Sequence, residues 1–113
     1  MMITRETVEA TVRAAVLRTP DAINPREGDS CLNTGPDGTY CIAAQAIVDL
    51  GFEPEFLEVG NTLEITSALG DAHLLGSFTE DAIDYLDYVQ HRFDDDTTSG
   101  LTWAQSLERL EDQ

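Results

Sequence analysis

The chain has 113 residues, close to the commonest size of one domain, and 42% of them are hydrophobic, too many for a disordered tail. Its 22 acidic residues outnumber six basic residues, all of them arginine, and give a formal net charge of −16. A surface this negative repels nucleic acid and anionic membranes, so we expect neither as a direct partner. Because no apolar run reaches the roughly 18 residues that cross a bilayer, and charges interrupt the first apolar positions, we expect a cytoplasmic protein without a signal peptide.

The first predicted helix begins after a Thr4 cap, continues to about Leu17 and stops before Pro20. Its apolar residues recur at helical spacing and form one stripe: Val8, Val12, Ala15 and Val16. The following segment, 21–38, is rich in Asp, Asn, Pro and Gly and predicts a loop. A tight-turn signal at 35–38 then predicts a short β-hairpin that pairs 30–33 with 39–42.

The only two cysteines, Cys31 and Cys41, flank this predicted turn, and a disulfide is the first arrangement to test. A turn about residues 36 and 37 sets Leu32 opposite Cys41, and a three-residue loop sets Asn33 there. Neither register places the two sulfur atoms directly across from each other. We therefore expect semi-buried thiols that behave as small apolar side chains.

The second predicted helix covers 41–50 and ends at Gly51, which suits a left-handed cap. It is apolar on most sides, so we expect it to be the central and most buried helix. Its inward residues are Ile42, Ala46, Ile47 and Leu50. A capping box at 61–64 predicts a short helix that ends at Gly70, with Leu63, Ile65 and Leu69 in the core.

The best-marked helix covers 80–93 after Thr79, with a core face of Ala82, Leu86, Val89 and Phe93, widened by Ile83 and Tyr85. Residues 94–100 predict a polar loop, and a capping box at 102–105 starts a last helix. That helix directs Trp103, Leu107 and Leu110 inward. The predicted fold is a mainly α (α+β) single domain over 1–113. It is a compact bundle of four to five helices with one small β-hairpin near 30–42, in which helix 80–93 packs against 41–50 and 102–111.

Negative charge gathers in the second half, where 53–113 carries a net −13 against −3 for 1–52. Carboxylates stack on one edge of helix 80–93, together with His91, and three more follow its predicted end. Like charges one turn apart, and acids at a helix C-terminus, are locally unfavourable, which indicates selection for something other than stability. The candidate partner-binding residues are Glu80, Asp84, Asp87, Tyr88, Asp94, Asp95 and Asp96. The alternatives are a solvated acidic face and a tyrosine that only half-covers its neighbours.

Metal sites and catalytic sites receive little support. A calcium loop that starts at Asp95 would have Ser106 at its twelfth position, where a bidentate Glu is required. Zinc would need ligands whose spacing matches no finger pattern: Cys31, Cys41, His73 and His91. Neither a phosphate-binding Gly-rich loop nor a nucleophile motif is present, so we predict no metal, no cofactor and no enzymatic activity.

Two stretches carry a resemblance to known proteins. The first is Tyr40-Cys41-Ile42 ahead of an Ala-rich helix that reaches Leu50-Gly51. The second is Phe78-Thr79, Ala82, Tyr85-Leu86, Val89-Gln90, Arg92, Asp94, Gly100 and Thr102-Trp103. Together with the absence of Lys, they resemble small uncharacterised proteins of tailed phages of actinobacteria, over about two-thirds of the chain. The resemblance implies an accessory role in which the protein binds and inhibits a host or defence protein.

We therefore expect a non-enzymatic accessory protein in the host cytoplasm. Its acidic second half is expected to bind a basic or nucleic-acid-binding host protein, in the sharper version as a DNA mimic. The alternative is a self-associating structural or virion-associated protein, such as a homodimer, with an apolar interface.

Overall fold

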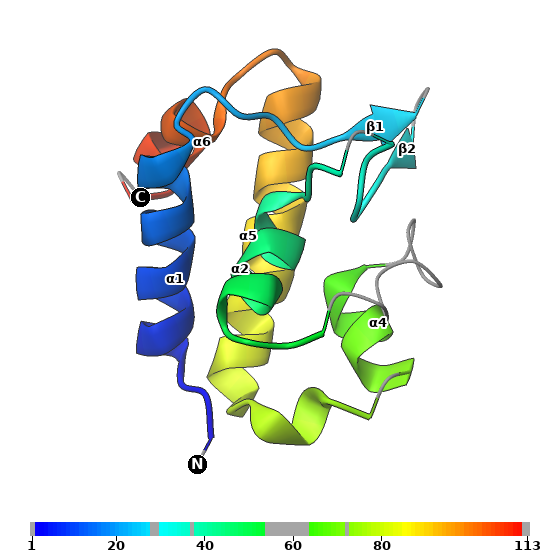
Figure 1. The fold of residues 1–113 in the computed structure, drawn as a ribbon. Coiled ribbons are helices and arrows are strands. Elements are labelled where there is room, and N and C mark those ends of the chain that lie inside the picture. The colour runs from blue at the N-terminus through cyan, green and yellow to red at the C-terminus, as the bar shows by residue number, and fades with distance from the viewer. Residues whose placement is uncertain (1, 28–29, 37, 54–63, 72, 112–113) are drawn as a thin grey trace.

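The computed structural model describes residues 2–27, 30–36, 38–53, 64–71 and 73–111. Within this part the chain forms five α-helices and one short 3₁₀ turn, so the expectation of a mainly α fold is confirmed. The helices are α1 (Arg5–Arg18), α2 (Ile42–Asp49), α4 (Ile65–Asp71), α5 (Glu80–Thr98) and α6 (Trp103–Glu111), and the turn is η1 (Leu75–Ser77). Figure 1 shows α5 as the long central helix. It packs against α1, α2, α4 and α6, which include both predicted partners.

Local signals predict α1 and α2 well. Thr4 caps α1, its side chain accepting a hydrogen bond from the Thr7 N–H, and the predicted stripe of Val8, Val12, Ala15 and Val16 is buried. Five residues of α2 are buried on several sides, as expected for the central helix: Ile42, Ala43, Ala44, Ala46 and Ile47. Gly51 follows α2 with a φ of +101°, the left-handed conformation that a residue without a Cβ adopts at low cost.

The predicted β-hairpin is not formed. Instead of a ladder between 30–33 and 39–42, the turn is closed by one isolated antiparallel bridge between Thr34 and Tyr40. The only ladder among the described residues joins the two-residue strands β1 (Arg26–Glu27) and β2 (Ser30–Cys31). Two bonds form the Thr34–Tyr40 bridge, from the Gly35 N–H to the Thr39 carbonyl and from the Cys41 N–H to the Asn33 carbonyl. The pairing goes no further because Cys41 already caps α2, so the chain is helical from Ile42.

The end of α5 differs from its prediction. The helix continues through Asp94–Asp96 to Thr98, and only then does Gly100, with a φ of +96°, turn the chain toward α6. The predicted polar loop at 94–100 is therefore wrong. The capping box of α6 is confirmed, because Gln105 accepts from the Thr102 N–H while Thr102 Oγ1 accepts from the Gln105 N–H.

The short helix α4 agrees with its prediction in part. Ile65 and Leu69 are buried as expected, while 61–63, including Leu63, lies outside the described residues. Gly70 does not end the helix, which includes it and continues to Asp71. In the described part of the chain, none of the helices combines the length and the apolar character needed to cross a membrane.

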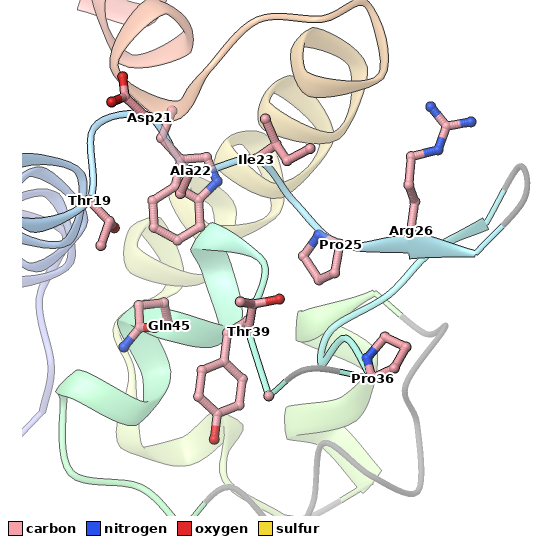
Figure 2. Close-up of a pocket in the computed structure, with 12 residues that line it drawn as sticks. Thr19, Asp21, Ala22, Ile23, Pro25, Arg26, Pro36, Thr39 and Gln45 are labelled. Atoms are coloured by element: carbon pink, nitrogen blue, oxygen red, sulfur yellow. The ribbon is translucent and has the colours of Figure 1, made fainter.

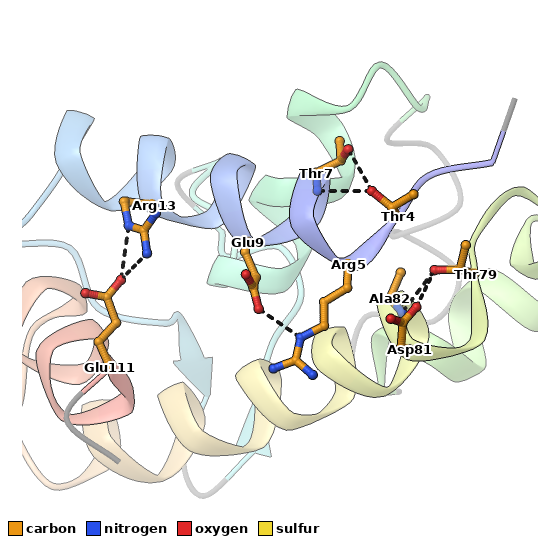
Figure 3. A network of polar contacts seen from close by, with 9 residues as sticks. All are labelled: Thr4, Arg5, Thr7, Glu9, Arg13, Thr79, Asp81, Ala82 and Glu111. Atoms are coloured by element: carbon orange, nitrogen blue, oxygen red, sulfur yellow. Dashed lines mark hydrogen bonds and ion pairs between the residues drawn. The ribbon is translucent and has the colours of Figure 1, made fainter.

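The start of the chain is bonded to the segment that leads into α5. Ile3 forms a parallel bridge with Phe78, its N–H donating to the Ser77 carbonyl and its own carbonyl accepting from Thr79. Thr79 then caps α5, its Oγ1 accepting from the Ala82 N–H. This tie places the first turn of α5 beside the start of α1, where Figure 3 draws both caps.

Candidate functional site

One edge of α5 is exposed over most of its length. Glu80, Asp84 and Asp95 are exposed, Asp87 is half-buried, and Tyr88 has 45% of its surface accessible. The opposite face buries Ala82, Leu86, Val89 and Phe93 as predicted, together with Tyr85. We call Glu80, Asp84, Asp87, Tyr88 and Asp95 the α5 acidic edge. Burial of the apolar face fixes the rotation of the helix and hence the direction in which this edge points.

Two of the sequence-predicted site residues do not belong to this edge. Asp96 is only 5% exposed, and its carboxylate accepts hydrogen bonds from Ser106 Oγ and Arg109 Nη1, both at 2.8 Å. Asp94 is half-buried and accepts from Asn24 Nδ2 at 2.6 Å. The structure thus brings five of the seven predicted residues to one exposed edge. It assigns Asp94 and Asp96 to contacts inside the fold.

Most of the positive charge is neutralised within the fold. Ion pairs between described residues join Arg5 with Glu9, Arg13 with Glu111, Arg18 with Asp49, and both Arg92 and Arg109 with Asp96. Figure 3 shows the first two pairs along α1. Among the described residues, no ion pair reaches Glu80, Asp84 or Asp95. The charge left for a partner is therefore negative and lies partly on the α5 acidic edge.

A second cluster lies where the chain enters α4. His91 Nε2 is 3.1 Å from Glu64 Oε1, and His91 Nδ1 is 2.9 Å from the Asp87 carbonyl oxygen and 3.5 Å from Asp87 Oδ1. The pKa of His91 is raised above 6.5, chiefly by the hydrogen bond to the Asp87 carbonyl. Burial, the next-largest effect, lowers this pKa, and the carboxylates of Asp87 and Glu64 raise it further. The sequence indicated the Asp87–His91 pair through its one-turn spacing. It gave no signal for Glu64, which belongs to another element.

In the described part, the structure shows no metal-binding cluster made of the four zinc ligands considered from the sequence, which are Cys31, Cys41, His73 and His91. Cys41 is buried at the start of α2, where its Sγ accepts from the Ala44 N–H and its thiol donates to Asn33 Oδ1, whereas His73 and His91 are exposed. The side chain of Cys31 lies outside the described residues, so the expectation of two thiols stays a prediction.

A groove of about 760 Å³ lies between the α1–β1 connection and the start of α2. In Figure 2, Thr19 and Asp21 lie at one end and Arg26 and Pro36 at the other. Its lining residues are Thr19, Asp21, Ala22, Ile23, Pro25, Arg26, Pro36, Gly38, Thr39, Tyr40, Gln45 and Trp103. They include neither Cys nor His, so the lining offers no thiolate–imidazole pair for nucleophilic catalysis.

Comparison with known proteins finds no match to this chain among protein-family models, curated proteins or solved structures. On the α5 acidic edge, Glu80, Asp84 and Asp95 combine exposure and an orientation fixed by the helix with the absence of an ion pair in the described part.

Proposed function

We propose that this protein is a non-enzymatic binding protein whose α5 acidic edge contacts a positively charged surface of a partner protein. The observation that carries the proposal is the separation of charge. Five arginines bond carboxylates within the fold, whereas Glu80, Asp84 and Asp95 have no ion pair in the described part. A basic partner can therefore pair with these carboxylates without breaking a bond that holds the fold together.

The arrangement of the edge favours a partner that ordinarily binds nucleic acid. Successive carboxylates at Glu80, Asp84 and Asp87 rise roughly 4.5–6 Å along the helix axis, a rigid row of negative charge. Protein surfaces that bind phosphate backbones present several Arg and Lys side chains together. The sharper form of the proposal, based on the charge, is a nucleic-acid mimic that occupies such a surface. The resemblance to phage accessory proteins implies that the partner is a host or defence protein, which the chain would bind and inhibit. Tyr88, 45% exposed beside the carboxylates, supplies an amphipathic anchor.

The test compares two triple variants with equal change in charge. Glu80→Gln, Asp84→Asn and Asp95→Asn neutralise the edge, whereas Glu53→Gln, Asp71→Asn and Glu108→Gln neutralise exposed carboxylates elsewhere. Binding of a labelled oligoarginine peptide is followed by fluorescence anisotropy over a series of salt concentrations. Exposed ion pairs contribute up to about 1 kcal/mol each, so the edge variant should bind roughly tenfold more weakly and with a smaller salt dependence.

The control triple separates a specific edge from net charge. It should retain most of the wild-type affinity, because its carboxylates are scattered over other elements. Equal losses in the two triple variants would mean that the peptide responds only to total charge, and the proposal would fail. Because all three side chains are exposed, we expect the edge variant to keep its helicity, which circular dichroism measures.

Self-association through an apolar surface is the second candidate, and one observation favours it. Leu17, at 73% exposure, and Ile23, at 53%, are the most exposed large aliphatic side chains in the described part, and they lie on either side of Pro20. Light scattering coupled to chromatography at low and high salt tests this candidate. A dimer that persists at high salt and dissociates in Leu17→Glu would support it, whereas a monomer under both conditions would remove it.

A further inference from the structure

Glu64, Asp87 and His91 form a cluster that spans two helices. One possible ligand atom from each residue lies within 4.8 Å of the other two. Glu64 stands directly before α4, while Asp87 and His91 lie one turn apart on α5. We propose that this cluster binds a first-row transition-metal dication, Zn²⁺ before others, and thereby joins the start of α4 to α5.

The ring of His91 is oriented in the way that metal-binding histidines commonly are. A carbonyl oxygen can only accept, so the 2.9 Å contact with the Asp87 carbonyl places the proton of the neutral ring on Nδ1. Metal-binding histidines commonly donate their second ring N–H to a backbone carbonyl or a carboxylate, which fixes the tautomer and the ring plane. The lone pair of His91 is then on Nε2.

That lone pair faces an oxygen atom of Glu64. Nε2 and Oε1 are 3.1 Å apart, and two lone pairs at this distance repel each other unless a proton or a metal ion lies between them. Ligand atoms of a tetrahedral zinc ion, each bound at about 2.0–2.2 Å, are roughly 3.4 Å from each other. The His91–Glu64 separation is thus close to that of two ligands of one zinc ion, and a proton is its competitor for the site.

Asp87 supplies a third ligand, and the surrounding charge attracts a cation. Asp87 already contacts His91 from the same helix face, and its half-exposed carboxylate can turn toward the ion. Two carboxylates and a neutral imidazole carry a charge of −2, and Glu80 and Asp84 add further negative potential along the edge. An imidazole ligand favours zinc and its neighbours over Mg²⁺ and Ca²⁺, which prefer sites made of oxygen alone.

The experiment is calorimetric titration of ZnCl₂ into the full chain at about pH 8, because the raised pKa of His91 keeps its ring protonated to a higher pH than that of an ordinary histidine. His91→Gln and Glu64→Gln should each weaken zinc binding by more than about tenfold, the smallest loss typical of removing even an outer partner of a ligand. His73→Asn is the matched control, since it removes the other exposed histidine and Asn tolerates the positive φ of 60° at that position. Cys31→Ser tests whether a thiol is the zinc ligand instead.

A second measurement tests whether zinc joins the start of α4 to α5. Hydrogen exchange of the α4 amides should slow when zinc is added to the wild type and should not change in Glu64→Gln. The proposal is overturned if His91→Gln binds zinc as tightly as the wild type, or if Cys31→Ser or His73→Asn abolishes binding. It is also overturned if Mg²⁺ at the same concentration displaces zinc, because the cluster would then act only as diffuse negative charge.

Discussion

The indole N–H of Trp103 donates a hydrogen bond of 2.9 Å to the side-chain oxygen of Asn24, and both residues are buried. The same oxygen accepts the backbone N–H of Ile42 at 2.9 Å, while Asn24 Nδ2 donates to Asp94 at 2.6 Å. One amide in the α1–β1 connection therefore joins the first turns of α2 and α6 to the last turns of α5. A connection that looks like a loop in the sequence holds three helix ends together.

Replacing Asn24 by Ala should destabilise the protein strongly. The substitution removes the oxygen that accepts from Trp103 and from Ile42, and Ala offers no acceptor to replace it. Each of the two buried N–H groups then loses its hydrogen bond, at a cost of about 1–3 kcal/mol. We expect the free energy of unfolding to fall by about 2–4 kcal/mol, measured by urea denaturation followed by circular dichroism. Gln45→Ala, which removes a side-chain bond to Asp49 alone, is the control and should change stability by less than about 0.5 kcal/mol.

Neighbouring aspartates on α5 should differ sharply in their effect. Asp96→Asn weakens the bonds that Ser106 and Arg109 donate to a buried carboxylate, and we expect a loss of about 2 kcal/mol in the free energy of unfolding. Asp95→Asn changes an exposed residue by the same chemistry and should stay within about 0.5 kcal/mol of the wild type. Equal losses at the two positions would contradict the orientation of α5 described above.

The aspartates at the end of α5 also show which contacts the sequence did not predict. The signals that locate α1, the start of α5 and α6 are local: Thr4, Thr79 and Thr102 each precede the helix they cap, and the apolar residues repeat at helical spacing. Asp94 and Asp96 looked like residues of a charged loop because their bonding partners are distant. Asn24 is 70 residues from Asp94, and Arg109 is 13 residues beyond Asp96 on another helix.

The candidate site, too, was predictable from the sequence only where its residues lie on a single helix. Periodicity on α5 placed Glu80, Asp84, Asp87 and Tyr88 on one exposed edge, since a single helix fixes their relation. The Glu64–His91 contact depends on how α4 packs against α5, which no spacing in the sequence encodes. The expected hairpin failed for a different reason: Cys41 caps α2, and the helix that begins at Ile42 takes up the residues that a longer second strand would need.

Cys41 should contribute to stability as a helix cap rather than as a reactive group. Its Sγ accepts the Ala44 N–H at 3.4 Å, a bond that Cys41→Ala removes and Cys41→Ser retains. We expect the Ala variant to lose about 1 kcal/mol relative to the Ser variant, measured by urea denaturation under reducing conditions. Equal stability of the two variants would mean that the cap contributes nothing.

Stability should depend on pH through His91 when zinc is removed by a chelator. The folded-state pKa of His91 is raised above 6.5 by the Asp87 carbonyl and the carboxylates of Asp87 and Glu64. A raised histidine pKa stabilises the fold fully below the unfolded value, and this contribution is lost as pH rises through the folded-state pKa. The urea midpoint should therefore fall between about pH 6 and about pH 8, by a small amount because the pair is half exposed. His91→Gln should flatten the curve in this range and His73→Asn should not. A wild-type midpoint that rises over the same interval would show that the contact with Glu64 does not stabilise the charged ring.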